Sequence, residues 1–158
     1  MSTAVASCPP VLESSASIHS SRPVFRPGGG LPGASPAGWT VLVVEDEKRV
    51  GVVVREFLRL TGHTVLEATH VDEAIEVCRA HGGPIDLLLT DVVMPDMNGR
   101  ELSEAAGRLR PGLRLLFMTG YTRNAIVHAG VLDPDVQVIA KPFTLEQLAA
   151  KLTVVLAK

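Results

Sequence analysis

The chain has 158 residues, of which 46% are hydrophobic and 20% are charged, and its formal net charge is −2. This length and composition are ordinary for one folded domain with its own hydrophobic core. The nearly balanced charge, without a basic block, gives no sign of direct binding to nucleic acid or to an anionic membrane, so proteins are the expected partners.

Cysteine content and the first residues favour a cytoplasmic protein. Cys8 and Cys78 are too few and too far apart for a disulfide framework, which suits a reducing compartment. No stretch approaches about 18 consecutive apolar residues, the length that would indicate a membrane span. No Lys or Arg precedes Arg22, so the charged start of a secretory signal is not recognisable either.

Residues 1–38 differ in composition from the rest of the chain. They hold eight of the nine serines, six of the eleven prolines and only three charged side chains. Such a segment has too few bulky apolar groups to offset the entropy lost on ordering. We therefore predict a disordered Ser/Pro/Gly-rich tail at 1–38 and a folded domain at 39–158.

From residue 39 onward, short apolar runs alternate with segments of helical spacing. Strands are predicted at 41–44, 64–68, 85–90, 113–118 and 136–140. Helices are predicted near 47–60, 71–81, 99–109 and 121–129, with a last helix from about residue 144. The glycines that follow these helices, where a left-handed C-cap is expected, are Gly62, Gly82 with Gly83, Gly112 and Gly130.

The first helix is the one whose local propensity conflicts with its periodicity. Val52, Val53 and Val54 favour a strand, yet the apolar positions keep helical spacing. Strict alternation of strand and helix with right-handed crossovers then predicts a doubly wound α/β fold. We expect a five-stranded parallel sheet in the flavodoxin-like order 2-1-3-4-5, with helices on both faces.

Reactive side chains follow four of the five predicted strands. These are Glu45 and Asp46 after the first strand, Asp91 after the third, Thr119 after the fourth, and Lys141 after the fifth. In the order 2-1-3-4-5 the first and third strands are neighbours, so the three carboxylates converge at the sheet edge where such folds bind ligands. Each carboxylate raises the pKa of the others, and a divalent cation would relieve this. An all-oxygen site suits Mg²⁺ better than zinc.

Each of these residues also has an ordinary structural explanation. Asp46 could cap the first helix, Asp91 and Thr119 could belong to turns, and Lys141 could be a solvated surface lysine. Their coincidence at four strand ends favours a functional site. The five histidines lack metal-ligand spacing and are interpreted as caps or surface residues, and Cys78 as a packing residue.

The motifs "VLVVEDE", "LLLTDVVMPDMNG", "FMTGYT" and "KPF" resemble the receiver domain of bacterial two-component response regulators, over residues 40–157. The stretch "GYTRNAIVHAGVLDPD" is similar to receivers attached to, or working beside, hybrid sensor histidine kinases. The resemblance implies that a sensor or hybrid histidine kinase, or a histidine phosphotransfer protein, is the partner.

The resemblance also implies a role for each site residue. Asp91 would be the phosphoacceptor, while Asp46 with Glu45 and the backbone carbonyl of Val93 would hold Mg²⁺. The residues that would bind the phosphoryl oxygens are Thr119 and Lys141, the latter before a cis Pro142 as is usual in the family. Catalysis would be limited to the protein's own phosphotransfer and dephosphorylation.

Two departures from the family pattern bear on signalling. Val138 stands three residues before the lysine, where the family commonly has Phe or Tyr, so the aromatic switch of the family is not expected to operate in its usual form. Nothing follows the last predicted helix, so we expect no output domain.

Three alternative functions remain open to the sequence. The chain could be the receiver module of a hybrid kinase system, or a protein-binding module that works without phosphorylation. A haloacid-dehalogenase type of enzyme would need a second Asp two residues after its nucleophile, where this chain has Val93.

Overall fold

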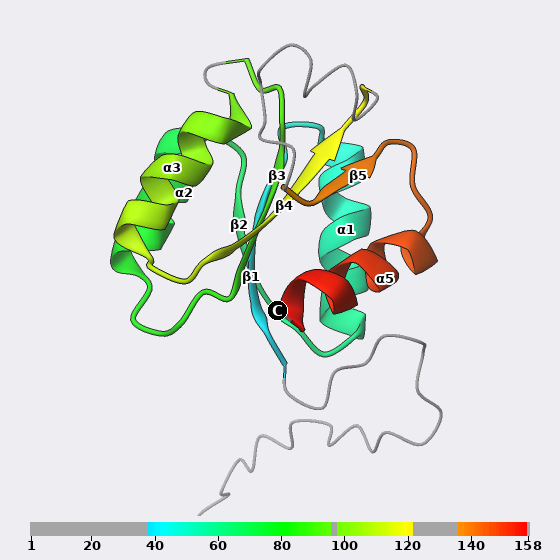
Figure 1. Cartoon of the computed structure of the whole chain (residues 1–158), viewed down its shortest axis with the longest axis horizontal. Coiled ribbons are helices and arrows are strands. Elements are labelled where there is room, and N and C mark those ends of the chain that lie inside the picture. The colour runs from blue at the N-terminus through cyan, green and yellow to red at the C-terminus, as the bar shows by residue number, and fades with distance from the viewer. Residues whose placement is uncertain (1–37, 96–97, 122–135, 158) are drawn as a thin grey trace, which may run out of the picture.

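The computed structural model describes residues 38–95, 98–121 and 136–157, in which strands and helices alternate along the chain (Figure 1). The strands are β1 (Thr40–Val44), β2 (Thr64–Ala68), β3 (Leu87–Asp91), β4 (Arg114–Thr119) and β5 (Val138–Ala140). The helices are α1 (Lys48–Leu60), α2 (Val71–Ala80), α3 (Gly99–Leu109) and α5 (Leu145–Leu156). The helix predicted at 121–129 and the tail predicted at 1–38 fall on residues outside the described part, apart from their ends at Tyr121 and Gly38.

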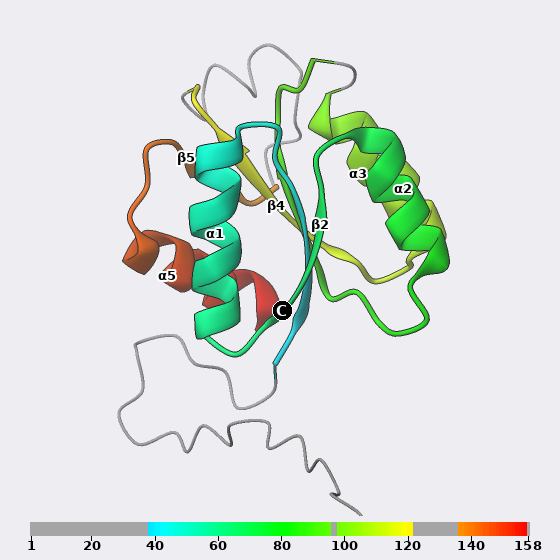
Figure 2. The same ribbon diagram turned by 180° about the vertical axis from the view of Figure 1, so that it is seen from behind.

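The sheet has the predicted topology. Its strands follow the order β2-β1-β3-β4-β5, and every neighbouring pair is parallel. Helices α1 and α5 cover one face, and α2 and α3 cover the other, as the two opposite views in Figures 1 and 2 show. The doubly wound α/β prediction is therefore confirmed.

The central strands are buried on both faces because both sides of the sheet carry helices. All residues from Val41 to Val44 and from Leu87 to Leu89 are completely inaccessible to solvent, which explains their continuous apolar sequence. The core is divided by the sheet into two layers, one under α1 and α5 and one under α2 and α3. None of the helices in the described residues is long and apolar enough to cross a membrane.

Helix α1 forms despite its three consecutive valines. Val54 and Leu58 point into the core, whereas Val52 and Val53 stay more than half exposed. Burial of one apolar face outweighs the small helix penalty of β-branched side chains, since propensity is a weak effect compared with tertiary packing.

One of the predicted glycine C-caps is confirmed: Gly62, directly after the C-cap Thr61 of α1, has a positive φ angle of 90°. Gly112 also has a positive φ angle, 87°, but it stands two residues after the C-cap of α3, Arg110, in the following turn. The φ angles of Gly82 and Gly83 are not positive, and Gly130 lies outside the described residues. Helix α2 instead ends on an extended residue, His81. Its last carbonyl groups accept hydrogen bonds from a distant guanidinium, that of Arg110, which donates to the carbonyls of Cys78 (2.7 Å), Gly83 (2.9 Å) and His81.

One histidine contradicts the surface interpretation. His63 follows α1 and is buried, and its Nδ1 accepts a hydrogen bond of 3.3 Å from the backbone N–H of Trp39. Cys78, in contrast, is buried in the α2 side of the core as expected for a packing residue.

Candidate functional site

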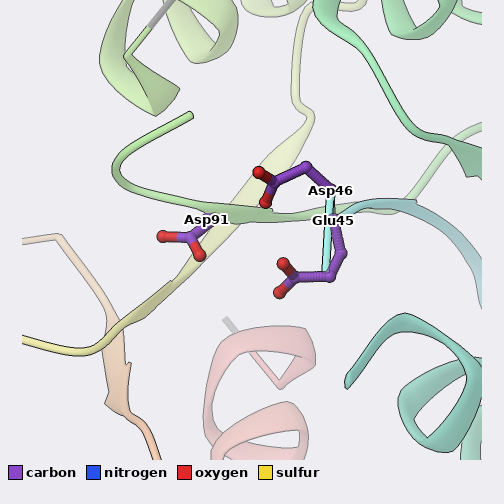
Figure 3. A group of neighbouring side chains, drawn as sticks. All are labelled: Glu45, Asp46 and Asp91. Atoms are coloured by element: carbon purple, nitrogen blue, oxygen red, sulfur yellow. The ribbon is translucent and has the colours of Figure 1, made fainter. Parts of the chain in front are cut away.

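The predicted site residues gather at the carboxyl edge of the sheet. Val44 of β1 and Thr90 of β3 are paired in register, so the residues that follow them, Glu45 and Asp91, emerge side by side. Figure 3 shows Glu45 and Asp46 extending their carboxylates toward Asp91. One carboxylate oxygen from each of the three residues lies within 4.8 Å of the other two. The predicted convergence of three acids is therefore present in the structure.

Glu45 is the buried member of this acidic group, with 1% of its surface exposed. One of its oxygens, Oε1, accepts the backbone N–H of Glu47 at 3.0 Å, and the other accepts Lys141 Nζ at 2.8 Å. Burial raises the pKa of Glu45 above its usual value although both hydrogen bonds act in the opposite direction. A lysine 96 positions away in the sequence thus offsets part of the cost of burying this carboxylate.

Asp91 is partly accessible and has both carboxylate oxygens engaged. Oδ2 accepts Lys141 Nζ at 2.7 Å, and Oδ1 accepts the backbone N–H of Val93 at 3.2 Å. Asp46 is exposed and takes no part in capping α1, whose N-cap is Glu47 without a side-chain hydrogen bond. The capping explanation for Asp46 is therefore not supported, and its carboxylate faces the shared space beside Asp91.

Lys141 follows the edge strand β5 and bridges the two carboxylates at the carboxyl edge of the sheet. Burial alone would lower the pKa of its ammonium group, but the hydrogen bonds and charges of Asp91 and Glu45 outweigh burial and raise that pKa. The Lys141–Pro142 peptide bond is cis. The Lys141 backbone N–H also donates to the carbonyl of Thr119 at 2.6 Å, which attaches this residue to the end of β4.

Thr119 lies at the same edge but does not bond to the acids. It is buried, and its Oγ1 accepts the backbone N–H of Tyr121 at 3.0 Å. In contrast, the side chains of Val93 and Tyr121 are largely exposed, at 55% and 60% of their surface. The structure thus places Thr119 one strand away from Asp91, with two exposed side chains at the rim of the site.

The charges of the site leave room for a cation. Three carboxylates face a single ammonium group, so the described site carries an excess of negative charge when all the acids are ionised. Carboxylate oxygens on a partly solvated edge are ligands for a hard divalent cation such as Mg²⁺, and neither His nor Cys is part of the cluster. The donor set therefore fits the ion that the sequence predicted.

Backbone donors are the part of the site that the sequence could not reveal. The amide groups of Glu47 and Val93 orient the two acids that Lys141 bridges. Every residue except proline carries such an amide, so no residue type marks these positions. Gly99, at the start of α3, also comes very close to Asp91, and its only sequence signal is a glycine where a helix begins.

Comparison with known proteins identifies relatives of this arrangement. A family model described as the response regulator receiver domain matches residues 41–153. The chain is 36% identical over 119 residues to the sensor kinase CckA of Brucella abortus (strain 2308), a match covering 75% of this chain but only 13% of CckA. It is 34% identical over 109 residues to the response regulator receiver protein CpdR of the same organism, covering 68% of this chain and 88% of CpdR.

Solved structures agree with this likeness. The receiver domain of the hybrid histidine kinase CckA matches with a TM-score of 0.63 and 32% identity, over 74% of this chain and 98% of that domain. The chemotaxis protein CheY4 of Vibrio cholerae matches with a TM-score of 0.65 and 27% identity, over 75% of this chain and 99% of CheY4.

Proposed function

Because the chain belongs to the response regulator receiver domain family, we propose that Asp91 accepts a phosphoryl group from the phosphohistidine of a partner protein. One observation carries this proposal: Lys141 Nζ lies 2.7 Å from Asp91 and 2.8 Å from Glu45, beside the exposed Asp46. The lysine places positive charge directly beside the carboxylate that would receive the phosphoryl group, at the ligand edge of a doubly wound sheet, and a bound divalent cation would offset the remaining excess of carboxylates.

Asp91 acts as the nucleophile. One of its oxygens attacks the phosphorus in line with the departing imidazole, and the O–P bond forms as the N–P bond breaks. The electron pair of the broken bond stays on the imidazole nitrogen, and the product is an acyl phosphate. The partial exposure of the Asp91 side chain, 15%, leaves the carboxylate within reach of a donor.

Glu45, Asp46, Asp91 and the backbone carbonyl of Val93 would hold Mg²⁺. When bound, this ion supplies positive charge to the carboxylates and to a phosphoryl oxygen. Glu45 accepts hydrogen bonds at both oxygens, and we therefore assign it a supporting role behind the more exposed Asp46.

Two side chains receive the phosphoryl oxygens. Lys141 stays protonated because its pKa is raised, and its compact ammonium group remains next to Asp91 as negative charge arrives. Thr119 contributes a hydroxyl donor from the neighbouring strand. Both act mainly by placing positive charge or a donor where negative charge accumulates, and such electrostatic stabilisation usually contributes most to the rate of this kind of reaction.

An exposed apolar strip on α1 and α5 favours a protein, rather than a small molecule, as the natural phosphoryl donor. Its exposed side chains are Val52, Val53, Leu60 and Leu145. A second groove, which shares Val53 with this strip, extends to Lys141. We propose that a helical surface of the phosphohistidine protein lies on this strip, because the strip continues through the second groove to the sheet edge that carries Asp91 and Lys141, here called the reacting edge.

Mass spectrometry after incubation with a small phosphodonor and Mg²⁺ tests the site. We expect one added phosphate on the wild-type protein and on the surface control Asp72→Asn, and none on Asp91→Asn. Calorimetry should also show that Mg²⁺ binding is lost in Asp46→Ala. Equal phosphate incorporation into Asp91→Asn would disprove the assignment of the phosphoacceptor, and unchanged Mg²⁺ affinity in Asp46→Ala would disprove that of the metal site.

The likeness to CckA keeps the hybrid-kinase context as a second candidate. That match covers a small part of a long kinase, whereas the match to CpdR covers most of a receiver protein. Phosphotransfer from purified candidate donors separates the two, because a relay protein should accept phosphate from a separate phosphohistidine protein at low micromolar concentration. A dependence on covalent tethering to the donor would favour the hybrid module.

A further inference from the structure

We infer that Gly99 and Phe117 are positioning residues for Asp91. Gly99 lets helix α3 begin directly against the main chain of Asp91. The ring of Phe117, on β4, packs beside Gly99 and against Val92, the residue after Asp91. The inference rests on the proposed role of Asp91. It concerns two residues that supply no atom to the phosphoryl group or to a metal ion and that act only through the placement of Asp91.

The chain is tied down on both sides of Asp91. After β3, the N–H of Val92 donates to the carbonyl of Met118 at 2.9 Å. The chain then returns, with Val93 and Asn98 forming an antiparallel bridge and the N–H of Gly99 donating to the Val92 carbonyl at 2.8 Å. We call residues 91–93 together with 98–99 the Asp91 turn. The position of the Asp91 main chain depends on how closely residues 98–99 approach the end of β3.

Gly99 permits that close approach. A Cβ atom on Gly99 would overlap the carbonyl oxygen of Asp91 itself, and it would lie 3.2 Å from Cε1 of Phe117. Neither neighbour is the end of a flexible side chain, since one is main chain and the other a ring buried to 1% exposure. Any larger residue at this position therefore has to move α3 or the Asp91 peptide.

Phe117 closes the other side of the Asp91 turn. It lies on β4 in register with Thr90, the residue before Asp91, and with Val138 of β5. Its ring packs with Val92 and Val138 in a small buried cluster. The aromatic ring of this region is thus supplied by β4, next to the valine at position 138. A displacement of Asp91 would press on this ring before reaching β5.

The test compares identical glycine-to-alanine changes at the two ends of one helix. Gly99→Ala should lower the rate of Asp91 phosphorylation by a small phosphodonor about tenfold to a hundredfold, the range expected when a reacting group is displaced by about 1 Å. Gly107→Ala, also in α3 but with open space around its added methyl group, should react at the wild-type rate. Phe117→Leu should fall between the two.

Controls separate positioning from stability and from the proposed function. Leu152→Ala destabilises the core from the opposite face of the sheet, under α5, and should react normally at temperatures where it is folded. NMR shifts of the Asp91, Val92 and Val93 amides should move in Gly99→Ala but not in Gly107→Ala, a readout that needs no phosphorylation. If Gly99→Ala does not fold, the phosphorylation rate and the amide shifts of Phe117→Leu test the inference instead.

Each outcome bears on a different claim. Wild-type rates and unmoved amide shifts in Gly99→Ala and Phe117→Leu would overturn the inference. So would a rate in Leu152→Ala reduced as much as in Gly99→Ala. A wild-type protein that takes up no phosphate on Asp91, combined with shifted amides in Gly99→Ala, would reject the proposed function but keep the positioning of the Asp91 turn.

Discussion

Val93 and Tyr121 are the exposed side chains at the rim of the site, and their chemistry bears on how long a phosphoryl group stays on Asp91. Hydrolysis needs a water molecule in line with the bond to be broken. Valine has no donor or acceptor that could orient such a water, whereas an amide at the same place could. Alignment of the attacking group is worth several kcal/mol in favourable systems, of which one side chain supplies only a fraction. We therefore expect a long-lived acyl phosphate.

The lifetime is measured by loading the protein with phosphate, removing the donor and following the decay with Mg²⁺ present. Val93→Asn should lose its phosphate faster than the wild-type protein. Tyr121→Phe shows whether the tyrosine hydroxyl holds the attacking water, in which case its decay is slower. A decay in Val93→Asn that equals or is slower than that of the wild type would show that this position does not control the water.

The sequence predicted which residues gather at the candidate site, but not how deeply each one is buried or what it contacts. The acids, the threonine and the lysine are recognisable because each directly follows an apolar strand run. The contrast between buried Glu45 and exposed Asp46 is not recognisable, because the two are adjacent in sequence. The buried Glu45 also has a partner, Lys141, that approaches it only in the folded chain. Burial and contacts are thus set by the folded chain, whereas the residue types can be read from the sequence.

At the scale of elements, the turn between α1 and β2 depends on a buried histidine. His63 Nδ1 accepts the Trp39 N–H, and burial lowers the pKa of His63 below its ordinary value of 6.5. Between the lowered and the ordinary pKa, the unfolded chain binds more protons than the folded one, so the free energy of unfolding falls as the pH falls. Among the described residues that line the cavity beside His63, no other side chain titrates.

Thermal unfolding should reveal this dependence. Acidification from about pH 7.5 to about pH 5.5 should lower the melting temperature of the wild type relative to His63→Asn, which keeps an acceptor but does not titrate. Glu45, whose pKa is raised by burial, acts in the opposite direction in both proteins and cancels in the comparison. The same substitution at an exposed histidine, His70→Asn, is the control and should leave the pH dependence of the melting temperature as it is in the wild type. Equal pH dependence in wild type and His63→Asn would contradict the prediction.

The elements themselves were largely predictable, and their ends less so. Strands and helices follow from periodicity, and even the valine-rich α1 kept its helical spacing. The end of α2 was predicted to within one residue, but the glycine cap predicted there is absent, because Arg110, 27 to 32 residues further along, donates to the carbonyls at this end. Likewise β3 begins at Leu87 rather than 85, after Asp86, whose side chain accepts the Thr40 N–H at 2.8 Å. Such long-range partners leave no periodic signal.

At the scale of the whole molecule, the apolar strip and the reacting edge can be tested separately. Val53→Glu and Leu60→Glu place charges on the strip of α1 without touching Asp91. Both variants should accept phosphate from a small phosphodonor at the wild-type rate but from a phosphohistidine protein at least about tenfold more slowly, a loss of about 1.4 kcal/mol in the docked state. Leu109→Glu, an exposed apolar position on α3, is the matched control.

Two results would contradict the docking proposal. One is an unchanged rate of transfer from the protein donor in both strip variants. The other is an equal loss in Leu109→Glu, which would mean that added negative charge anywhere on the surface repels the donor.

Residues 1–38 should be dispensable for folding and phosphorylation, because their composition provides no core to join. A protein starting at Gly38 should keep its melting temperature within about two degrees of the full chain. Its uptake of phosphate should also be unchanged. A large drop in melting temperature would mean that Val24, Phe25 or Leu31 packs on the domain.

The two ends of the described domain meet at the same small cavity. Trp39, which precedes β1, and Leu156 with Ala157, at the end of α5, all line it, together with His63. Trp39 lies at the end of the sheet opposite to Asp91, because β1 runs from there toward the acids. Adjacent ends allow a domain to be inserted into a surface loop of another protein, or to be circularly permuted, with little cost in stability. The domain can therefore be joined to a longer chain at one end of the sheet while the opposite edge stays open to the proposed phosphoryl donor.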